Sequence, residues 1–504
     1  MDVEALRRRM RPERRERFDS VWRATFYPLK RPAEPSLSSS FRSCFSREHA
    51  EVLVKHNLAT PAPGPGPMKN IPFNVYEDRG GGRQRFILWT RDANDRLDSE
   101  GYEADVPLHH ISSYLSAINT EAASQRDFRC GFYQIEIPKD ALPFFRFPAA
   151  DGSWWQLTRL PMGHSCAPEL MHTLAATAAG HPLYVSPEFV ECDVSVDVWI
   201  DNVRYCGVRG AVRAATRRLD ATQRACAITW KEADSVDLGT RYCFLGVDWN
   251  HEAGTVAPSD KLLSRLRSFP LNTPVSAAEV ESLGGRLLHA SAIAGVFPGS
   301  FYFSLKWIRR VVNSLNNGAR TPSSLVSVPP SVQRSLSEWV AKVGAPRAIR
   351  ESSGPPRYTA FVDASTKGWG AVVVCGSSFA VKVLGASWSA EERAQHINVL
   401  EAQAFRNTVE LLPEDAAGTR VSFLIDNTTV ISVGHKGSCV RNEALNRAVV
   451  SALERCENLS ISFSLRYIRS GDNPADVPSR VDLSSFDRSD EAAVQRALWR
   501  FFSR

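Results

Sequence analysis

Four carboxylates in the last third of the sequence stand inside or at the end of apolar segments that read as strands or helices. They are Asp363 in TAFVDAS, Glu401 in HINVLEAQAF, Asp426 at the end of VSFLID, and Asp476 after SGDNPAD. A buried carboxylate is costly unless it is paired, hydrogen-bonded or metal-bound. Phosphodiester hydrolysis by two Mg²⁺ ions needs carboxylates from several elements, because the ions lie about 3.5 to 4 Å apart. The set predicts such a site, although Asp426 alone could turn the chain and Asp476 alone could cap a helix.

Two acids nearer the N-terminus suggest a second metal site. Asp127 precedes GFYQIEI, and Asp201 lies in VDVWIDNVRYCG, which reads as a hairpin. Nucleotidyl transfer also uses two metal ions, and carboxylates on neighbouring strands can hold them. An Asp-Asn step is an ordinary hairpin turn, so Asp201 alone has a purely structural explanation. The hypothesis therefore depends on the surrounding motifs.

The elements around this second pair form a mixture of strands and helices. The patterning predicts strands at 86–89 and 132–137, a helix at 167–179 and a hairpin at 194–206. This mixture predicts an α+β fold for residues 70 to 250.

The rest of the chain divides into a helical part and a second β-rich part. Residues 257–316 have helical periodicity and precede a Pro/Ser-rich stretch at 321–330. A Gly/Pro loop at 351–357 precedes YTAFVDAS, which places a boundary near Arg357. Beyond that residue the expected order is strand, helix, strand, helix and a last strand at 461–468.

Composition limits the class of protein. With 504 residues and 43% hydrophobic content the chain can bury several cores, and the length favours about three domains. We find no stretch of about 18 to 20 apolar residues and no secretory signal, so we expect an intracellular protein without a membrane segment, in the nucleus or the cytoplasm. The ten cysteines are scattered without zinc spacing. A net charge of +6 is compatible with a polyanionic partner but does not require one.

The C-terminal motifs resemble a retroelement ribonuclease H. The strings are DASTKGWGA, WSAEERAQHINVLEAQA, FLIDNTTV and YIRSGDNPADVPSR, and they cover roughly residues 357 to 480. The HIN-x-LE and N-x-AD-x-PSR forms are most similar to DIRS-like retroelements, which integrate with a tyrosine recombinase. The resemblance implies that Asp363, Glu401, Asp426 and Asp476 bind two Mg²⁺ ions, with Mn²⁺ as an alternative, and cleave the RNA strand of an RNA-DNA hybrid.

The earlier motifs resemble a reverse transcriptase over about residues 70 to 316. They include YEDRGGGRQRFILWTRDAN, LPMGHSCAPELMHTL, TWK and FLG around Asp127 and Asp201. The resemblance implies that Asp127 and Asp201 are catalytic metal ligands and that Phe132 excludes the ribose 2′-hydroxyl. It further implies nucleotide binding by Arg85, Phe132, Met162 and Lys231, and nucleic-acid binding by Arg91, Asn94, Gly163, Phe244, Leu245 and Gly246.

Two positions depart from the reverse-transcriptase pattern. The usual Tyr-x-Asp-Asp box reads Trp199-Ile200-Asp201-Asn202, and Trp89 replaces an acid that is common in the fingers motif. Asn202 offers a carbonyl oxygen but no negative charge, so metal affinity should fall if the second acid normally contributes. The polymerase is therefore expected to be active or weakened, with an inactive one as the alternative.

The expected organisation is an α+β multidomain protein, with a right-hand polymerase of fingers, palm and thumb-like helices before a ribonuclease H-like α/β domain with a mixed central sheet. The expected parts are a basic, Pro/Ser/Gly-rich and flexible extension (1–69), fingers and palm (70–256), thumb-like helices and linker (257–356), the ribonuclease H-like domain (357–482) and a helical tail (483–504). The expected partners are an RNA template, a DNA primer or product, an RNA-DNA hybrid and deoxynucleoside triphosphates, with the oligomeric state open. A polyprotein fragment is compatible with the sequence.

Three functions remain open from the sequence. The first is an RNA-directed DNA polymerase with ribonuclease H activity. The second is a ribonuclease H whose polymerase half only binds nucleic acid. The third is a domesticated, non-enzymatic nucleic-acid-binding protein, which the intact acids at all four ribonuclease positions disfavour.

Overall fold

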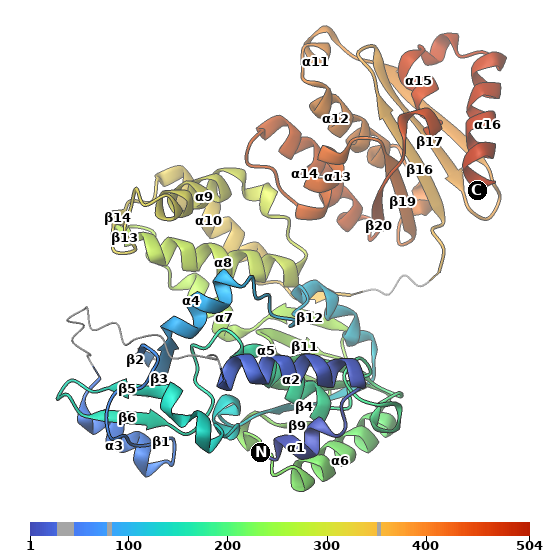
Figure 1. Ribbon diagram of the computed structural model, residues 1–504. Helices are drawn as coiled ribbons and strands as arrows, with labels where there is room; N and C mark the ends of the chain where they lie inside the picture. Colours follow the sequence, from blue (N-terminus) through green and yellow to red (C-terminus); the bar gives the residue numbers. More distant parts are fainter. Residues whose placement is uncertain (28–44, 78–82, 350–353, 504) are drawn as a thin grey trace. The chain divides into compact units, whose positions relative to one another are not determined.

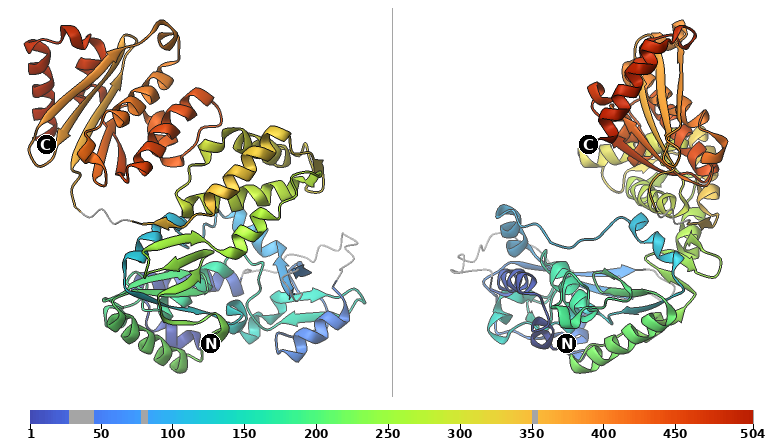
Figure 2. Two further views of the ribbon diagram at one scale, coloured as in Figure 1. Left: turned by 180° about the vertical axis from the view of Figure 1, so that it is seen from behind. Right: turned by 90° about the vertical axis from the view of Figure 1, so that its right-hand side faces the viewer.

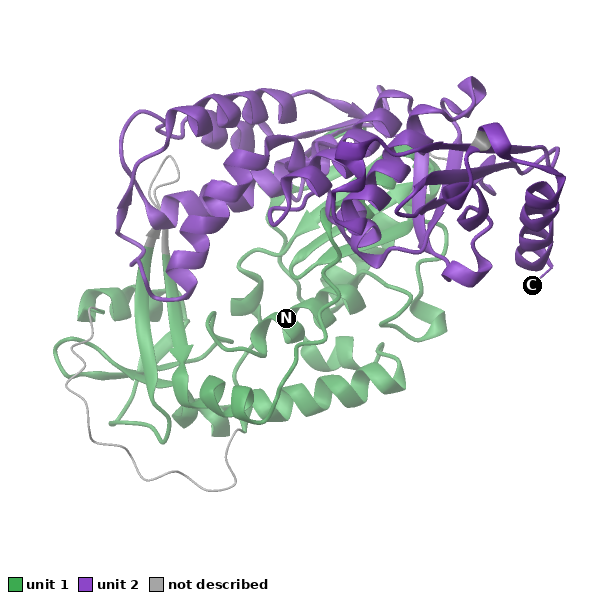
Figure 3. Cartoon of the chain, turned by 90° about the horizontal axis from the view of Figure 1, so that it is seen from above, with its two compact units in different colours: residues 1–242 green, residues 243–504 purple. Residues whose placement is uncertain are grey.

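The chain folds into two compact units, Met1–Tyr242 and Cys243–Arg504 (Figure 3). The computed structural model describes residues 1–27, 45–77, 83–349 and 354–503. None of the helices in these ranges has the length and apolar content needed to cross a membrane. Both units contain helices and strands, so the α+β class expected from the sequence is confirmed.

The first unit begins with helices that belong to its core. These are α1 (Val3–Arg7), α2 (Pro12–Phe26) and α3 (Arg47–Lys55). Leu6, Phe18 and Val21 are buried in the same core as residues between Ala59 and Trp230. The expectation of a flexible extension, with a folded core starting near Asn70, is therefore wrong for the described part of this segment. The many charged residues of α2 concealed an apolar face on the opposite side of the helix. The Pro/Ser stretch at 32–40 lies outside the described residues.

Three sheets follow in the first unit. The smaller two are the pair β2 (Asn70–Glu77) and β3 (Arg83–Thr90), and the three strands β1 (Ala59–Pro61), β6 (Trp154–Leu157) and β5 (Arg146–Pro148). The third has the order β7-β8-β4-β9, with β7 Ser195–Trp199, β8 Asn202–Gly207, β4 Ala122–Asp127 and β9 Val236–Gly239. The helices are α4 (Arg91–Ser99), α5 (Ala167–Ala178) and α6 (Arg209–Ala225).

The predicted strand at 86–89, helix at 167–179 and hairpin at 194–206 are confirmed by β3, by α5 and by β7 with β8. The predicted strand at 132–137 is wrong, because a 3₁₀ turn occupies Gly131–Gln134. Cys130 adopts a left-handed conformation, with φ of 52°, immediately before this turn. The left-handed residue turns the chain, so the alternating side chains that follow do not continue an extended strand.

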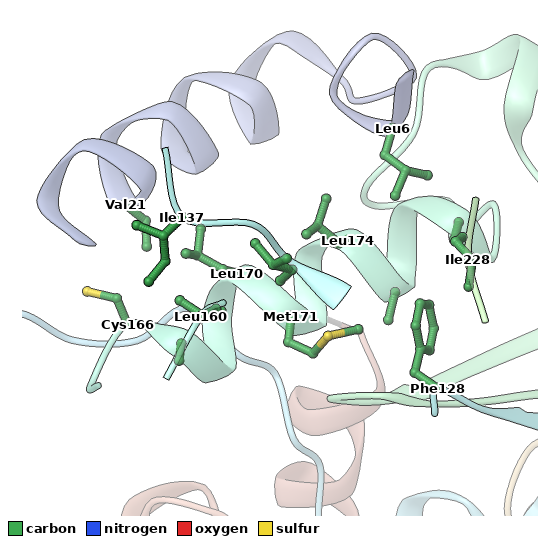
Figure 4. Packing of buried hydrophobic residues seen from close by; sticks show 14 of the residues in the cluster. Leu6, Val21, Phe128, Ile137, Leu160, Cys166, Leu170, Met171, Leu174 and Ile228 are labelled. Atoms are coloured by element: carbon green, nitrogen blue, oxygen red, sulfur yellow. The ribbon is translucent and has the colours of Figure 1, made fainter. Parts of the chain in front are cut away.

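Helix α5 lies at the centre of the first unit's core. Its side chains are buried around almost its whole circumference, as expected for a helix covered on several sides. Figure 4 shows Leu170, Met171 and Leu174 of this helix. They lie among Leu6 and Val21 of the N-terminal helices and Phe128 and Ile137. The N-terminal helices thus help to bury the element that follows the LPMGHSCAP loop.

The second unit begins with a largely helical part. Its helices are α7 (Asp260–Arg267), α8 (Ala277–Ala294), α9 (Tyr302–Asn316) and α10 (Pro330–Val343), which confirms the helical periodicity predicted for 257–316. Its strands are β11 (Val247–Asn250), β12 (Thr255–Pro258), β15 (Arg347–Ala348) and the pair β13 (Val275–Ser276) and β14 (Leu325–Val326), while β10 (Arg241–Phe244) spans the point where the two units join in sequence. Trp339 is fully buried here and stacks on Phe301 at 5.1 Å between ring centroids.

A mixed five-stranded sheet follows, with the order β18-β17-β16-β19-β20 (Figure 1). The strands are β16 (Tyr358–Ala364), β17 (Gly368–Cys375), β18 (Val381–Ser387), β19 (Arg420–Ile425) and β20 (Ser462–Tyr467). The pairs β16/β17 and β17/β18 are antiparallel, whereas β16/β19 and β19/β20 are parallel. The mixed central sheet expected from the sequence is present. The expected order of elements does not include β17 and β18. The GWGA string at the start of β17 was assigned to a motif and not to a strand.

Helices cover both faces of this sheet. They are α11 (Ala390–Arg393), α12 (Ile397–Glu410), α13 (Thr428–Lys436), α14 (Glu443–Asn458), α15 (Asp476–Arg480) and α16 (Arg488–Phe502). Alternating residues of β16 divide between two cores, because Val362 packs with residues of α12 and α14 whereas Phe361 packs with Val494 and Leu498 of α16. Both views of Figure 2 show the C-terminal helix beside the strands.

Candidate active sites

Three of the four predicted C-terminal acids converge at one edge of the mixed sheet. Asp363 lies near the end of β16 and Asp426 directly follows β19, and these strands are parallel neighbours with Val362 opposite Ile425. Glu401 reaches the same place from α12. One carboxylate oxygen from each residue lies within 4.8 Å of the others, in the only such cluster of three possible ligands among the described residues. Parallel pairing therefore brings together acids that are far apart in the sequence.

Asp363 and Glu401 occupy an environment that disfavours their charged forms. Asp363 and Glu401 are 3% and 5% exposed. Burial, followed by repulsion from Asp363 and Asp426, raises the pKa of Glu401 to about 9. Burial also raises the pKa of Asp363 to about 7, with smaller contributions from Asp426 and Asp476. A bound cation would relieve this repulsion, because it adds positive charge where the carboxylates repel one another.

The oxygen set fits a hard divalent cation. Oε2 of Glu401 is buried and has no hydrogen-bond partner, so no protein donor satisfies this oxygen. Carboxylate oxygens are the ligands that Mg²⁺ and Mn²⁺ prefer. The triad Asp363, Glu401 and Asp426 is therefore a candidate metal site.

The fourth predicted acid lies beside the triad but makes a different contact. Asp476 begins α15, and its Oδ1 accepts hydrogen bonds of 2.9 and 2.6 Å from Arg480. It is close enough to contribute to the raised pKa of Asp363. It is not a member of the triad whose oxygens lie within 4.8 Å of one another. Asp476 is thus near the site with its carboxylate engaged by an arginine.

The loop before Asp476 is fixed to the sheet by polar contacts that the sequence reading did not identify. Asn473 is buried, donates from Nδ2 to the Val362 carbonyl at 2.9 Å, and accepts from the Ala475 amide at 3.1 Å. Ser470 donates to Asp426. Both residues belong to the SGDNPAD string, whose dense turn-forming residues were a usable signal.

Asp127 and Asp201 occupy adjacent positions at the end of the sheet that contains β4, β7 and β8. Asp127 ends β4 and pairs in register with Asn202, the first residue of β8. Asp201 is the second residue of the two-residue turn between β7 and β8, and its carbonyl accepts from the Phe128 amide at 3.0 Å. The register thus places the main chain at Asp127 next to the Asp201–Asn202 turn.

Asp201 is held in a half-buried and tightly packed position. Burial raises its pKa, while the Asn202 amide and the nearby Arg85 guanidinium oppose that rise. Nδ2 of Asn202 donates to Oδ1 of Asp201 at 3.1 Å. A Cβ atom added to Gly131 would lie 3.1 Å from Cβ of Asp201 and 3.0 Å from Sδ of Met171. Gly131 therefore permits the close approach of Asp201 to the turn after Asp127.

The predicted nucleotide-binding residues lie on elements that meet this region. Arg85 of β3 acts electrostatically on Asp201. Phe132 is partly buried and packs against the core of the first unit. The Lys231 amide donates to the Asp127 carbonyl at 2.8 Å, while Nζ of Lys231 contacts Asp234. The Arg85 side chain therefore acts on Asp201, whereas Lys231 meets Asp127 through its main chain.

Met162, Gly163 and Asn94 connect β3 to the loop before α5. The Met162 carbonyl accepts from Leu88 at 3.0 Å, and a Cβ on Gly163 would lie 2.7 Å from the Leu88 carbonyl oxygen. Nδ2 of Asn94 donates to the Gly163 carbonyl at 2.8 Å, and its Oδ1 accepts from Ser165 at 3.0 Å. The side-chain amide of Asn94 is thus engaged within the protein.

The remaining predicted contacts are divided between the units. Arg91 pairs with Asp95 at 3.5 Å, and its guanidinium lies 5.7 Å from the Trp89 ring centroid. Phe244, Leu245 and Gly246 form the β10–β11 connection, where Leu245 and Gly246 both have positive φ. In the second unit the ring of His289, which the sequence reading missed, lies 3.2 Å from the Leu245 carbonyl oxygen.

No protein-family model and no curated protein matches this chain. Three similar solved structures are of foamy viral protease-reverse transcriptase. The dRH form with double-stranded DNA is 13% identical, has a TM-score of 0.49, and matches 92% of this chain and 80% of that chain. A second complex with double-stranded DNA is 14% identical with a TM-score of 0.46 and coverage of 92% and 97%. The complex with an RNA/DNA hybrid is 13% identical with a TM-score of 0.47 and coverage of 93% and 62%. The chain is thus similar, over most of its length, to solved foamy viral protease-reverse transcriptase structures.

Proposed function

We propose that the chain is an RNA-directed DNA polymerase with ribonuclease H activity, encoded by a DIRS-like retroelement. The observation that carries the proposal is the convergence of Asp363, Glu401 and Asp426 within 4.8 Å, in the same positions at which the sequence motifs resemble a ribonuclease H. The proposed parts are fingers and palm at 70–256, thumb-like helices at 257–356, and the ribonuclease H-like domain at 357–482 with a helical tail at 483–504. The location in nucleus or cytoplasm stays open.

In the proposed nuclease site, Asp363, Glu401 and Asp426 would hold divalent cations for cleavage of the RNA strand. Bound Mg²⁺ or Mn²⁺ would activate a water and neutralise charge on the attacking and leaving oxygens. The chain itself supplies buried carboxylates whose mutual repulsion favours a cation, as the raised pKa of Glu401 indicates. Asp476 would join the site if its carboxylate were released from Arg480.

In the proposed polymerase site, Asp127 and Asp201 hold the metal ions at the primer terminus. Arg85 would contact the triphosphate of the incoming deoxynucleotide, with Met162 and Lys231 as further nucleotide contacts. Phe132 would exclude a ribose 2′-hydroxyl. Template and primer contacts would come from Arg91, Asn94, Gly163 and the Phe244-Leu245-Gly246 turn. Asn94 and Gly163 would contact nucleic acid through main-chain or other exposed atoms. The reason is that the Asn94 side-chain amide already donates a hydrogen bond to the Gly163 carbonyl.

A second candidate function is a ribonuclease H whose palm only binds nucleic acid. The observation that favours it is the Asn202 side chain, which donates to Oδ1 of Asp201 at 3.1 Å instead of adding a carboxylate to the site. A metal ion at Asp201 would compete with that hydrogen bond and would find one negative charge fewer than in a site with two adjacent acids.

The experiment compares the wild type with Asp201→Asn and Asp363→Asn. Extension of a labelled DNA primer on an RNA template and cleavage of labelled RNA in a hybrid are measured in parallel, with Mg²⁺ and with Mn²⁺. We expect extension to be lost only in Asp201→Asn and cleavage only in Asp363→Asn. Cleavage without extension in either metal would establish the second candidate. Nucleic-acid binding with neither activity would establish a non-enzymatic binding protein and overturn the proposal.

A further inference from the structure

The hairpin that carries Asp201 has a turn that its own sequence does not favour. Trp199 pairs with Asn202, so Ile200 and Asp201 form a two-residue connection. Such connections favour Asn or Gly where φ is positive. Ile200 has a φ of 55°, a conformation that is strained for a β-branched side chain. The turn residues therefore do not favour this register, so contacts away from the turn must fix the register of β7 and β8.

A buried ion pair crosses these two strands next to the turn. Asp197 of β7 and Arg204 of β8 are register partners. Nε and Nη2 of Arg204 donate to Oδ2 of Asp197 at 2.9 and 2.6 Å, and Nη1 donates to the Tyr242 hydroxyl at 3.4 Å. The Arg204 side chain is 0% exposed. A register in which the guanidinium lost its carboxylate would leave a buried charge without its partner, which is strongly unfavourable.

The same register decides whether the palm acids meet. Arg204 lies two residues from Asn202 along β8 and is opposite Gln125, while Asn202 is opposite Asp127. Residues two apart on a strand share a face, so a slip of one residue would turn this set to the other side of the sheet. A slip would also move Asp201 by about 3.4 Å along the strand, away from the close contact that Gly131 permits.

We propose that the Asp197–Arg204 ion pair is a positioning device that holds β7 and β8 in the one register that presents Asp201 beside Asp127. This inference rests on the proposed polymerase function for its catalytic consequence. It assigns no contact with substrate or metal to either residue. The pair acts through Asp201, and it compensates for the unfavourable turn at Ile200.

The test replaces the whole pair by apolar residues, in the double variant Asp197→Leu/Arg204→Met. Exchanging a buried ion pair for apolar side chains often leaves stability unchanged or raises it, so a folded protein is expected. We expect the thermal midpoint to be retained while kcat for primer extension falls about a hundredfold, the size of effect that a small misplacement of catalytic groups can produce. Hybrid cleavage by the same molecules should stay unchanged. The conservative variant Asp197→Glu, which keeps the charge, should recover most of the extension.

The matched control is Glu191→Leu/Arg218→Met, which removes another ion pair of the first unit. Nε and Nη2 of Arg218 donate to Glu191 at 2.6 and 2.5 Å, and Arg218 lies on α6, outside the hairpin. This variant should extend primers like the wild type. Equal losses in both double variants, or full extension by Asp197→Leu/Arg204→Met, would overturn the proposal.

Two readouts keep the inference testable if the wild type does not extend primers, in which case the polymerase function itself fails. Both are made in an Asp363→Asn background, which removes one ligand of the C-terminal triad. The first is amide hydrogen exchange across residues 195–207, and the second is Mn²⁺ affinity measured by calorimetry. Loss of protection and weaker Mn²⁺ binding in Asp197→Leu/Arg204→Met support the positioning role. Unchanged protection and affinity overturn it.

Discussion

At the scale of single residues, Glu401 shows most directly how burial prepares a site for a cation. Its carboxylate is almost fully enclosed, one oxygen has no hydrogen-bond donor, and Asp363 and Asp426 repel its charge. Without a cation this arrangement costs free energy. This arrangement is thus expected to lower the stability of the metal-free protein and to raise the affinity of the site for a divalent ion.

Glu401→Gln should separate these two effects, because glutamine keeps the shape of glutamate without its charge. We expect cleavage to fall at least about a hundredfold, an effect that corresponds to about 2.7 kcal/mol. In EDTA the thermal midpoint should be equal to or above that of the wild type, and the rise on adding Mg²⁺ should shrink. Differential scanning fluorimetry measures both midpoints. Glu410→Gln, at an exposed position of the same helix, is the control, and an undiminished Mg²⁺ effect in Glu401→Gln would contradict the assignment.

His164 should make the first unit sensitive to acid. Burial lowers the pKa of His164 to about 4, compared with about 6.5 for an exposed histidine. The unfolded chain therefore binds more protons between these values, so the stability due to neutral His164 is present above pH 6.5 and is lost as the pH falls toward 4. At pH 5 the loss is about 2 kcal/mol.

Hydrogen exchange of the α5 amides, corrected for the intrinsic effect of pH, measures this loss. The wild type should lose more protection between pH 7 and pH 5 than His164→Asn, which keeps an acceptor for the Cys166 amide but does not titrate. His172 also has a pKa lowered to about 4 by burial, so some pH dependence should remain in the variant. The same loss in both proteins would show that His164 is not responsible.

At the scale of elements, α15 is positioned by close contact with a glycine of β17. A Cβ on Gly370 of β17 would lie 2.4 Å from the Ser479 amide nitrogen and 2.8 Å from the Ala475 carbonyl oxygen. Ser365 adds a hydrogen bond of 2.6 Å to the Ser479 carbonyl. The helix therefore lies directly on the backbone of the sheet, and this contact brings Asp476 beside the triad.

Gly370→Ala should push α15 away from β17, since the new methyl group would meet backbone atoms that cannot rotate aside. We expect a destabilisation of about 1 to 3 kcal/mol and a loss of hybrid cleavage, with primer extension retained. Gly285→Ala in α8 is the control, because a Cβ there meets nothing within 4 Å. Cleavage at the wild-type rate in Gly370→Ala would show that the position of α15 does not matter for the nuclease.

The sequence predicted the acidic triad because each acid stands at the edge of a strongly patterned element. It did not reveal the contact between Asp476 and Arg480, since an i, i+4 pair on a short helix has no separate signature among many charged residues. The N-terminal helices were missed because charges obscure the apolar face of α2. The prediction of a strand at 132–137 is wrong because Cys130 adopts a left-handed conformation and a 3₁₀ turn follows it. Parallel pairing of β16 with β19 is a long-range event that no local pattern encodes.

At the scale of the whole molecule, the chain carries two candidate metal sites with different charge. The C-terminal triad offers three carboxylates, whereas the second site offers Asp127 and Asp201 with Asn202 beside them. Arg85 further reduces the negative field at Asp201. The two activities should therefore differ in their demand for metal.

In the wild type, cleavage should reach half its maximal rate at about a tenfold lower Mg²⁺ concentration than extension, equivalent to about 1.4 kcal/mol of binding free energy. Asn202→Asp adds one carboxylate beside Asp201. It should lower the Mg²⁺ concentration needed for half-maximal extension without changing that for cleavage, so the two concentrations should come closer together. Parallel Mg²⁺ titrations of both activities measure this. The electrostatic argument would be contradicted if extension needed the same Mg²⁺ concentration in the wild type and in Asn202→Asp.

The covering of the mixed sheet by α16 has a consequence for biosynthesis. Phe361 of β16 is fully buried against residues of α16, including Phe501 at 5.0 Å between ring centroids. During translation at about 5 to 20 residues per second, the strand emerges from the ribosome several seconds before the helix that covers it. For that interval the apolar face of the nascent sheet is open to chaperones, and the core that supports the candidate metal site is complete only after residues 488–502 have emerged from the ribosome.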